Sequence, residues 1–370
     1  MSSLLKDRYN PTFYEILSNA ITKVYPHFNK KKFIKEIFCE DFENKELKGR
    51  MKHTTTVVHQ FLPSDFKETS ALWINIVDVL RKEGHQGLAL EFMFIPDYIE
   101  TFGIEYFKES TEVFEKITSF TSCEFAVRPF IIKYEEKMLK IMQSWSKHND
   151  HHVRRLASEG SRSRLPWAIA LPKFKTDPTP ILPILHQLKN DPSEYVRRSV
   201  ANSINDISKD NPNIVYEIIQ SWKGAGKETE AIIKHGSRTL LKKGDVIVLN
   251  YFNLNEKEHL ICKNFSIHQK QIKIGESIVF SFELVNNENH TCKVRLEYGI
   301  YYLRNNGTHS KKVFKISERE LQPGEKLFIE RKQSFRVITT KQFYLGEQKL
   351  SIIINGKEKF IGNFELLKEN

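Results

Sequence analysis

The sequence predicts two domains, the first all-α and the second all-β. Three observations predict this division. Helix start and stop signals recur up to about residue 245, a motif repeats within that part, and apolar residues alternate with polar ones from about Leu260. The chain has 370 residues, which is enough for two sizeable cores. We expect the helical domain over residues 1–255 and the β-domain over residues 256–370.

Capping residues predict where several of the helices begin. In NDPSEYVRRSVANSINDIS, Asp191 suits an N-cap and Pro192 the first helical position. Asn211–Pro212 repeats this start signal. Pro166 is expected to begin a further helix, so the first domain is predicted to consist of short helices joined by turns.

An internal repeat runs through the helical part. HVRRLASEG and YVRRSVANS align with Val153 and Val196 in the same place, an offset of 43 residues. HEAT and armadillo repeats have periods of about 40–47 residues. VRR is short enough to recur by chance, but the capping signals favour a genuine repeat. We therefore predict a HEAT-like-repeat solenoid, whose stacked helices leave a concave surface.

Apolar side chains alternate in two segments of the second part. SIVFSFEL and CKVRLEY each place four on one face: Ile278, Phe280, Phe282 and Leu284, then Cys292, Val294, Leu296 and Tyr298. Asn305–Gly307 and Asn355–Gly356 are hairpin signals. Roughly seven short strands in about 110 residues predict an immunoglobulin-like sandwich.

The charge balance favours an anionic partner. The chain carries 57 Lys and Arg against 46 Asp and Glu, a formal charge of +11. This points to nucleic acid before a membrane surface, although a soluble basic protein is the alternative. No apolar run approaches the ~20 residues of a membrane helix, and no secretory signal is recognisable, so we expect a cytoplasmic protein. The cysteines predict neither a zinc site nor a disulfide scaffold, because they are scattered: Cys39, Cys123, Cys262 and Cys292.

Acids accompany arginines in three of the predicted helices. Residues four apart on a helix share a face. The pattern is Glu124 with Arg128, Arg155 with Glu159, and Arg198 with Asn202 and Asp206. Salt bridges on solvated faces, worth a few tenths of a kcal/mol each, are the alternative explanation. The spacing makes acids on a basic concave face plausible and does not establish catalysis.

RRLASEGSRSRLPWA closely resembles the signature of AlkC-type DNA alkylation-repair glycosylases, a HEAT-like-repeat family. LKGRMKH, SCEFAVRPFI, YVRRSVANSINDISKDNP and HGSRTLLKKG extend the resemblance over the whole helical part. Some members carry a C-terminal immunoglobulin-like domain, as predicted here. One departure is Ser163, where the family pattern has proline in an Arg-Pro-Arg run.

The resemblance implies a monofunctional DNA glycosylase that acts in base-excision repair on cationic methylated bases, chiefly 3-methyladenine and 3-methylcytosine. Its partner would be double-stranded DNA containing alkylated bases, bound by a monomer without cofactor or metal. Glu159 and Asp206 match the principal active-site carboxylates, Glu124 a third acid, and Trp167 the aromatic residue of a Leu-Pro-Trp motif. The DNA-binding candidates are Arg154, Arg155, Arg162, Arg164, Arg198, His235 and Arg238.

Several alternatives stay open at this point. A noncatalytic helical-repeat adapter for DNA or protein uses the same folds. Trp167 is nearly as well explained by core packing, the role expected of Trp73, Trp145 and Trp222. The histidines of KHNDHHVRR have no evident ligand set around them, so phosphate contact or plain surface is preferred over zinc. The resemblance implies recognition within bent DNA, whereas ordinary glycosylases flip the base out.

Overall fold

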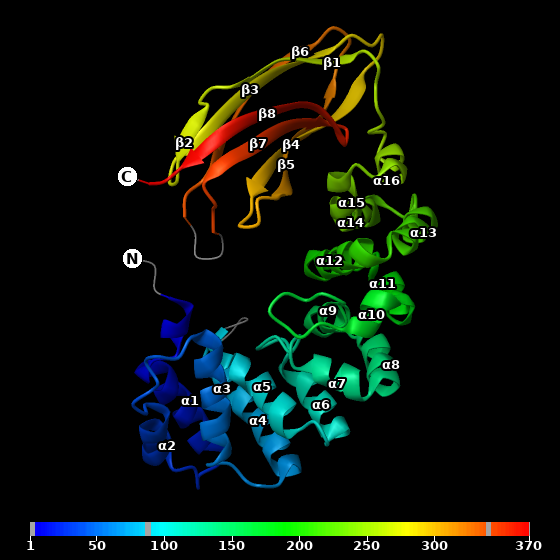
Figure 1. The fold of residues 1–370 in the computed structure, drawn as a ribbon. Coiled ribbons are helices and arrows are strands. Elements are labelled where there is room, and N and C mark those ends of the chain that lie inside the picture. The colour runs from blue at the N-terminus through cyan, green and yellow to red at the C-terminus, as the bar shows by residue number, and fades with distance from the viewer. Residues whose placement is uncertain (1–3, 86–89, 338–341, 370) are drawn as a thin grey trace. The chain divides into compact units, whose positions relative to one another are not determined.

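The computed structural model describes residues 4–85, 90–337 and 342–369, and Figure 1 shows its helices and strands. Residue contacts divide the chain into two units, Met1–Gly236 and Ser237–Asn370. The first unit is helical. The second begins with two short helices and continues as β-strands, so the predicted order of an all-α part followed by an all-β part is confirmed.

The first unit is built from short helices in sequence order. They are α1 (Pro11–Val24), α2 (Lys30–Ile37), α3 (Leu47–His59), α4 (Phe66–Lys82), α5 (Phe94–Phe102), α6 (Phe107–Ile117), α7 (Val127–Lys133), α8 (Glu135–Trp145), α9 (His151–Gly160), α10 (Pro172–Thr176), α11 (Leu182–Leu188), α12 (Glu194–Asp210), α13 (Pro212–Trp222) and α14 (Lys227–Gly236). Short 3-10 segments lie at Leu5–Arg8, Leu90–Met93 and Thr179–Ile181.

The second unit begins with α15 (Arg238–Lys243) and α16 (Val246–Tyr251). The strands follow: β1 (Leu260–Ile267), β2 (Gln271–Lys273), β3 (Ser277–Asn286), β4 (Cys292–Leu303), β5 (His309–Leu321), β6 (Lys326–Ser334), β7 (Gly346–Ile354) and β8 (Lys357–Leu367). They form one sheet in the order β1-β3-β6 and another in the order β2-β8-β7-β4-β5.

The alternating residues of β3 and β4 fill the core of the second unit, as their period of two predicts. Both sets of four apolar side chains are buried in one cluster with residues of β7 and β8. The Asn355–Gly356 turn joins β7 to β8, and both of its residues have positive φ. The type I′ hairpin turn requires positive φ at both central residues, and Asn-Gly supplies it.

The helix-start predictions succeed at one place and are wrong at two others. Helix α13 begins at Pro212 with Asn211 at the N-cap, as predicted. Helix α12 begins at Glu194, with Ser193 at the N-cap, because the Asp191 carboxylate instead accepts the Ser193 backbone N–H over 2.8 Å within the preceding turn. Pro166 begins no helix, and the chain stays irregular until α10.

The two halves of the predicted repeat lie on neighbouring helices. Val153 on α9 and Val196 on α12 are both buried, and the two helices pack against each other. The hydroxyl oxygens of Ser158 and Ser199 lie 2.6 Å apart at this contact. This contact joins the C-terminal half of α9 to the N-terminal half of α12. The assignment to HEAT-like repeats stays a prediction.

Candidate active site

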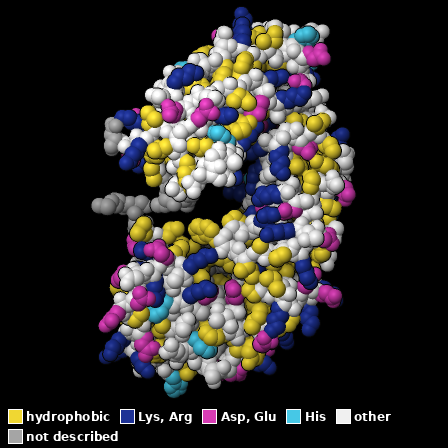
Figure 2. All heavy atoms as spheres, viewed as in Figure 1, with side chains coloured by type: hydrophobic (Ala, Val, Ile, Leu, Met, Phe, Trp, Pro, Cys, Tyr) yellow, Lys and Arg dark blue, Asp and Glu magenta, His cyan; other side chains and the backbone are white. Residues whose placement is uncertain are grey.

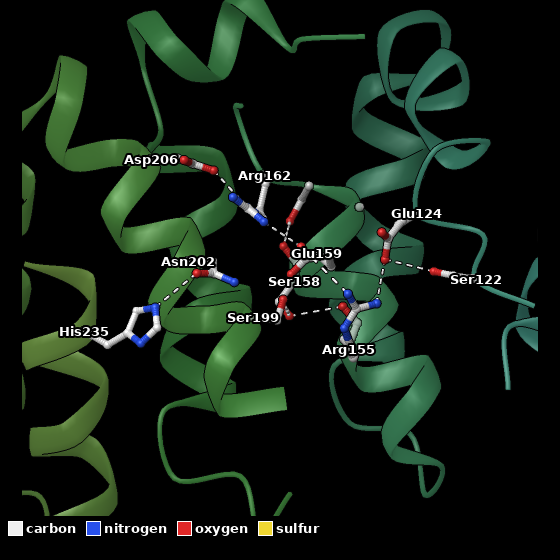
Figure 3. Close-up of polar contacts among 12 residues, drawn as sticks. Ser122, Glu124, Arg155, Ser158, Glu159, Arg162, Ser199, Asn202, Asp206 and His235 are labelled. Atoms are coloured by element: carbon white, nitrogen blue, oxygen red, sulfur yellow. Dashed lines mark hydrogen bonds and ion pairs between the residues drawn. The ribbon is translucent and has the colours of Figure 1, made fainter. Parts of the chain in front are cut away.

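Arg162 links Glu159 and Asp206, the two acids that match the principal active-site carboxylates of the family. Its Nη1 donates to Glu159 Oε1 over 2.6 Å and its Nε donates to Asp206 Oδ2 over 2.8 Å (Figure 3). Glu159 is 5% exposed, Asp206 1% and Arg162 6%. Arg162 was predicted to face phosphate, but it lies between the carboxylates because a buried acid pair needs a compensating charge.

Glu159 lies in the last turn of α9, beside the start of the irregular 161–171 segment. Arg155, one turn earlier, places its Nη2 at 3.8 Å from Glu159 Oε1, so the predicted four-residue relation is present. Both arginine contacts of Glu159 involve Oε1, and among the described residues no hydrogen bond or ion pair joins Oε2. One oxygen of this buried carboxylate therefore has lone pairs available to a water or a ligand.

Glu124 joins the cluster from a turn, not from a helix. Its Oε2 accepts the Arg155 Nη1 over 2.6 Å and the Ser122 hydroxyl over 2.8 Å. The expected pairing of Glu124 with Arg128 is wrong, because Glu124 precedes α7 and the helical spacing does not apply. Arg155 also lies over the ring of Tyr195, with its guanidinium carbon 4.4 Å from the centroid.

Arg128 holds the loop that follows α9, a role that its spacing from Glu124 did not indicate. Its guanidinium is fully buried and donates to three backbone carbonyls, those of Gly160 (2.9 Å), Arg162 (2.7 Å) and Ile169 (2.5 Å). These carbonyls belong to the segment that follows α9. Arg128 therefore fixes both ends of the loop that carries Arg162 and Trp167, and only the surrounding SCEFAVRPFI motif marked it in the sequence.

Trp167 is not a core residue, whereas Trp73, Trp145 and Trp222 are buried as predicted. Its side chain is 66% exposed and its φ is 67°, in the left-handed region that a bulky residue rarely adopts. The Lys48 ammonium donates to the Trp167 carbonyl over 2.5 Å. An exposed indole on a strained backbone is typical of a functional contact and not of packing. Ser163 lies in the same loop and is buried.

The remaining DNA-binding candidates fall into two groups. Arg154 is used within the fold, since it pairs with Asp191 at 2.6 Å and donates to the carbonyls of His148 and Asn149. The others lie nearer the surface: Arg164 pairs with Asp210, Arg198 with Glu194, and His235 contacts Asn202 at 3.2 Å. Arg238 begins α15, in the second contact unit.

The electrostatics of the cluster keep its arginines charged. Burial lowers the pKa of Arg162, but the carboxylates of Glu159 and Asp206 outweigh that effect and raise it overall. The pKa of Arg155 is also raised, since Glu124 and Glu159 outweigh its burial. Burial and the charge of Arg162 lower the pKa of Arg128 to about 10, which still leaves it protonated at neutral pH.

Basic side chains surround this cluster on the molecular surface. Figure 2 shows Lys and Arg side chains gathered over α12 on the visible face of the first unit. The Lys209 ammonium, 2.9 Å from the second oxygen of Asp206, belongs to this basic surrounding. A positive surface attracts a polyanionic partner. The acids within that surface suit a positive charge at one place on the partner.

The first two histidines of α9 form a group with its N-cap residue that their spacing did not indicate. Asp150, His151 and His152 each bring one ligand atom within 4.8 Å of the others. The Asp150 carboxylate accepts the His152 backbone N–H over 2.8 Å as the N-cap of α9. Burial is the main cause that lowers the pKa of His152. Helix capping accounts for this carboxylate, and we assign no metal to the group.

No helix within the described ranges is long and apolar enough to cross a membrane.

Comparison with known families identifies the class of protein to which this fold and its acid–arginine cluster belong. A family model described as "DNA alkylation repair enzyme" matches residues 41–240. A second, described as "Uncharacterised protein YhaZ, C-terminal Ig-like domain", matches residues 261–368. The chain belongs to the DNA alkylation repair enzyme family and carries a C-terminal immunoglobulin-like domain.

Two relatives match over almost the whole chain. YhaZ of Bacillus subtilis (strain 168) is 39% identical over 98% of this chain and 99% of its own length. The structure of the Pseudomonas fluorescens alkylpurine DNA glycosylase AlkC, bound to DNA containing an abasic site analog, matches with a TM-score of 0.91. It is 33% identical, and the match covers 99% of this chain and 100% of that one. The resemblance to AlkC-type proteins that the motifs indicated is thereby confirmed.

Proposed function

We propose that this chain is a monofunctional DNA glycosylase that hydrolyses the N-glycosidic bond of cationic methylated bases, 3-methyladenine and 3-methylcytosine. The observation that carries the proposal is the buried pair Glu159 and Asp206, joined by Arg162 on a basic surface. Membership of the DNA alkylation repair family and the match to AlkC support it. We further propose that the enzyme acts as a monomer, without cofactor, on double-stranded DNA.

The chemistry needs acids as anions and not as proton donors. A base methylated on a ring nitrogen already carries positive charge, so it leaves as a neutral molecule without protonation. Bond cleavage transfers positive charge to the deoxyribose, which becomes oxocarbenium-like, as in glycoside hydrolysis. A carboxylate beside the sugar stabilises this state, and a second one orients or deprotonates the attacking water.

Simple electrostatics shows that one carboxylate can account for a large rate effect. A unit charge pair at about 4 Å with an effective dielectric constant near 20 gains roughly 4 kcal/mol. If this gain is confined to the transition state, it corresponds to about a thousandfold in rate. Glu159 is our first candidate for the sugar, because its Oε2 is not used by the arginines.

Neighbouring residues would place the nucleotide. Trp167, exposed beside the cluster, is proposed to contact the lesion or its deoxyribose. Arg155 is held at the site by Glu124 and is proposed to contact the DNA backbone with Arg164, Arg198, His235 and Arg238. Phosphate contacts of this kind make affinity fall with salt. Arg162 and Arg154 are assigned to holding the acids and the fold instead.

The direct test is release of methylated bases by the full-length protein. DNA treated with a methylating agent is incubated with the protein, and released bases are separated by chromatography. We expect 3-methyladenine and 3-methylcytosine to appear well above the level without protein. Saturable DNA binding with no base release would support a noncatalytic adapter instead and reject the proposal.

The division of roles between the domains needs a separate measurement. We propose that residues 1–255 carry the glycosylase site and that residues 256–370 form the immunoglobulin-like domain. The 1–255 fragment, checked for helical content by circular dichroism, is compared with the full chain for base release. Release by a folded fragment would assign the chemistry to the helical part alone, and its loss would assign a necessary role to the second domain.

A further inference from the structure

A second ion pair attaches the loop that carries Trp167 to α12. Arg164 donates to Asp210 through two nitrogens, from Nε to Oδ2 over 2.8 Å and from Nη2 to Oδ1 over 2.6 Å. Two positions earlier in the loop, Arg162 donates to Asp206. Asp206 and Asp210 are four residues apart on α12, so they share a face of that helix, about one turn apart. Two arginines of the loop therefore hold it along the last turns of α12.

The pair of Arg164 and Asp210 is suited to fixing geometry more than to stabilising the fold. Their side chains are 38% and 25% exposed, whereas Arg162 and Asp206 are buried. An ion pair that water reaches adds little to the free energy of unfolding. Two parallel hydrogen bonds, however, fix both the distance and the orientation of the guanidinium. The hydrogen bonds from Arg164 are also the main cause that lowers the pKa of Asp210, so this carboxylate is ionised at neutral pH.

Arg164 lies at the start of an exposed turn that ends at Leu171. Leu165 and Leu171 are buried at the two ends of this turn. The Ser163 carbonyl accepts the Leu171 N–H over 3.2 Å, which closes the loop at its base. Trp167 lies in the exposed part between the two leucines. The direction in which the turn leaves the fold is therefore set at its base, next to Arg164.

Trp167 needs such a fixed base. Its φ of 67° is strained for a bulky residue, and a strained backbone persists only where the surrounding contacts determine it. Lys48 donates to the Trp167 carbonyl, and Arg128 donates to a carbonyl further along the loop. The pair of Arg164 and Asp210 supplies the corresponding contact where the chain enters the turn.

We propose that Asp210 is a positioning residue of the glycosylase site, which holds Arg164 and so sets the turn that presents Trp167 to the lesion. The inference rests on the proposed function, in which Trp167 contacts the lesion or its deoxyribose. Asp210 touches neither of them and acts through Arg164. More than a third of the Arg164 side chain is exposed, so the guanidinium can meet a DNA phosphate while Asp210 holds its other edge.

The test separates the rate of base release from the affinity for DNA. Asp210→Asn keeps the shape and removes the charge, and release from a methylated duplex is measured under single-turnover conditions with the full-length protein in saturating excess. We expect a rate about tenfold below the wild type, because a misdirected contact slows the chemical step, and a dissociation constant for DNA within about threefold of the wild type. Asp78→Asn, which breaks an exposed pair with Arg81 on α4, is the matched control and should keep the wild-type rate.

Hydrogen exchange reports on the loop without any DNA. A peptide that contains Leu171 is followed by mass spectrometry, because the Leu171 N–H is bonded at the base of the loop. In Asp210→Asn we expect this N–H to exchange about tenfold faster, while peptides of α4 exchange as in the wild type. A variant that is destabilised as a whole would exchange faster in both places, so the comparison separates a local effect from a general loss of stability.

A double-mutant cycle shows whether Asp210 acts through Arg164. Arg164→Lys keeps a positive charge for a phosphate but loses the planar fork, so it should slow base release about as much as Asp210→Asn. The variant with both changes should be no slower than either single variant, since each change removes the same contact. Losses that multiply in the double variant would show that the two residues act independently and would overturn the inference.

Two further results would overturn it: a folded Asp210→Asn protein that releases the base at the wild-type rate, or a loss that lies only in the affinity for DNA. If the wild type releases methylated bases and Asp210→Asn leaves the exchange of the loop unchanged, the proposed function stands and the inference is wrong. Absence of base release from the wild type would reject the proposed function, and the exchange of the loop would then still decide whether Asp210 holds the turn.

Discussion

The Nε of Arg162 donates to Asp206 Oδ2 over 2.8 Å, although 44 residues separate them. The contact ties the loop after α9 to the middle of the candidate active site on α12. Because both side chains are buried, neither charge can be satisfied by bulk water if the other is removed. Arg162 is therefore the partner that the two acids share, beside Arg155 at Glu159 and Lys209 at Asp206.

Removal of the Arg162 guanidinium should strongly destabilise the folded protein. Arg162→Met leaves the buried Glu159 and Asp206 carboxylates without their shared partner, and we expect a loss of about 3–5 kcal/mol in the free energy of unfolding. Urea denaturation at neutral pH measures it. Arg198→Met removes an exposed arginine paired with Glu194 and should cost less than about 1 kcal/mol. Similar losses in both variants would contradict the bridging role.

Arg128 should resist even conservative replacement. Lysine keeps the charge but lacks the planar fork that donates to the carbonyls of Gly160, Arg162 and Ile169. We expect Arg128→Lys to lose about 2–4 kcal/mol of stability, since buried carbonyls lose their donors. Arg81→Lys, a more exposed arginine that also donates to a carbonyl, is the control. Equal unfolding midpoints for the two variants would remove Arg128 from this role.

Trp167 should matter for activity and not for stability. Its side chain is 66% exposed, so Trp167→Ala is expected to change the free energy of unfolding by no more than about 0.5 kcal/mol while lowering the rate of base release. Trp73→Ala, in the core, should instead cost about 3–5 kcal/mol. A stable Trp167→Ala variant with wild-type release would exclude the proposed lesion contact.

Glu100 should make stability depend on pH. Its folded pKa of about 7 lies above its ordinary value, so the folded state binds more protons than the unfolded state between about pH 4.5 and 7. Stability should therefore fall as pH rises through this window, by up to about 3 kcal/mol, less what partial exposure screens.

The matching measurement is urea denaturation from pH 5 to pH 8. Glu100→Gln removes this titration, so it should unfold at the same urea concentration as the wild type near pH 5 and at a higher one near pH 8. A constant difference between the two proteins across the range would show that Glu100 has no raised pKa.

The sequence was informative wherever structure depends on local spacing. Arg155 and Glu159 share a face of α9 because four residues make about one helical turn. The alternation in β3 and β4 likewise placed the core of the second unit correctly. The spacing rule was wrong for Glu124 and Arg128, since Glu124 lies in a turn and turns have no helical period.

Contacts between residues far apart in the chain could not be predicted from local residue spacing. The bridge from Arg162 to Asp206 depends on how α9 packs on α12, and a run of arginines alone does not show which one turns inward. A cavity of about 150 Å³ likewise combines α3, α5 and the Trp167 loop, which are distant in the chain. The partners of Arg128 are backbone carbonyls, and a carbonyl carries no sequence identity.

The central claim is that Glu159 acts on the sugar as a carboxylate. Glu159→Gln keeps the side-chain volume and removes the charge, and release of 3-methyladenine from a defined duplex is measured under single-turnover conditions. We predict a loss of about a thousandfold in rate, with DNA affinity within a few-fold of the wild type. Glu194→Gln, at an exposed position of α12, should retain the wild-type rate. A folded Glu159→Gln protein that releases the base within tenfold of the wild-type rate would contradict the mechanism.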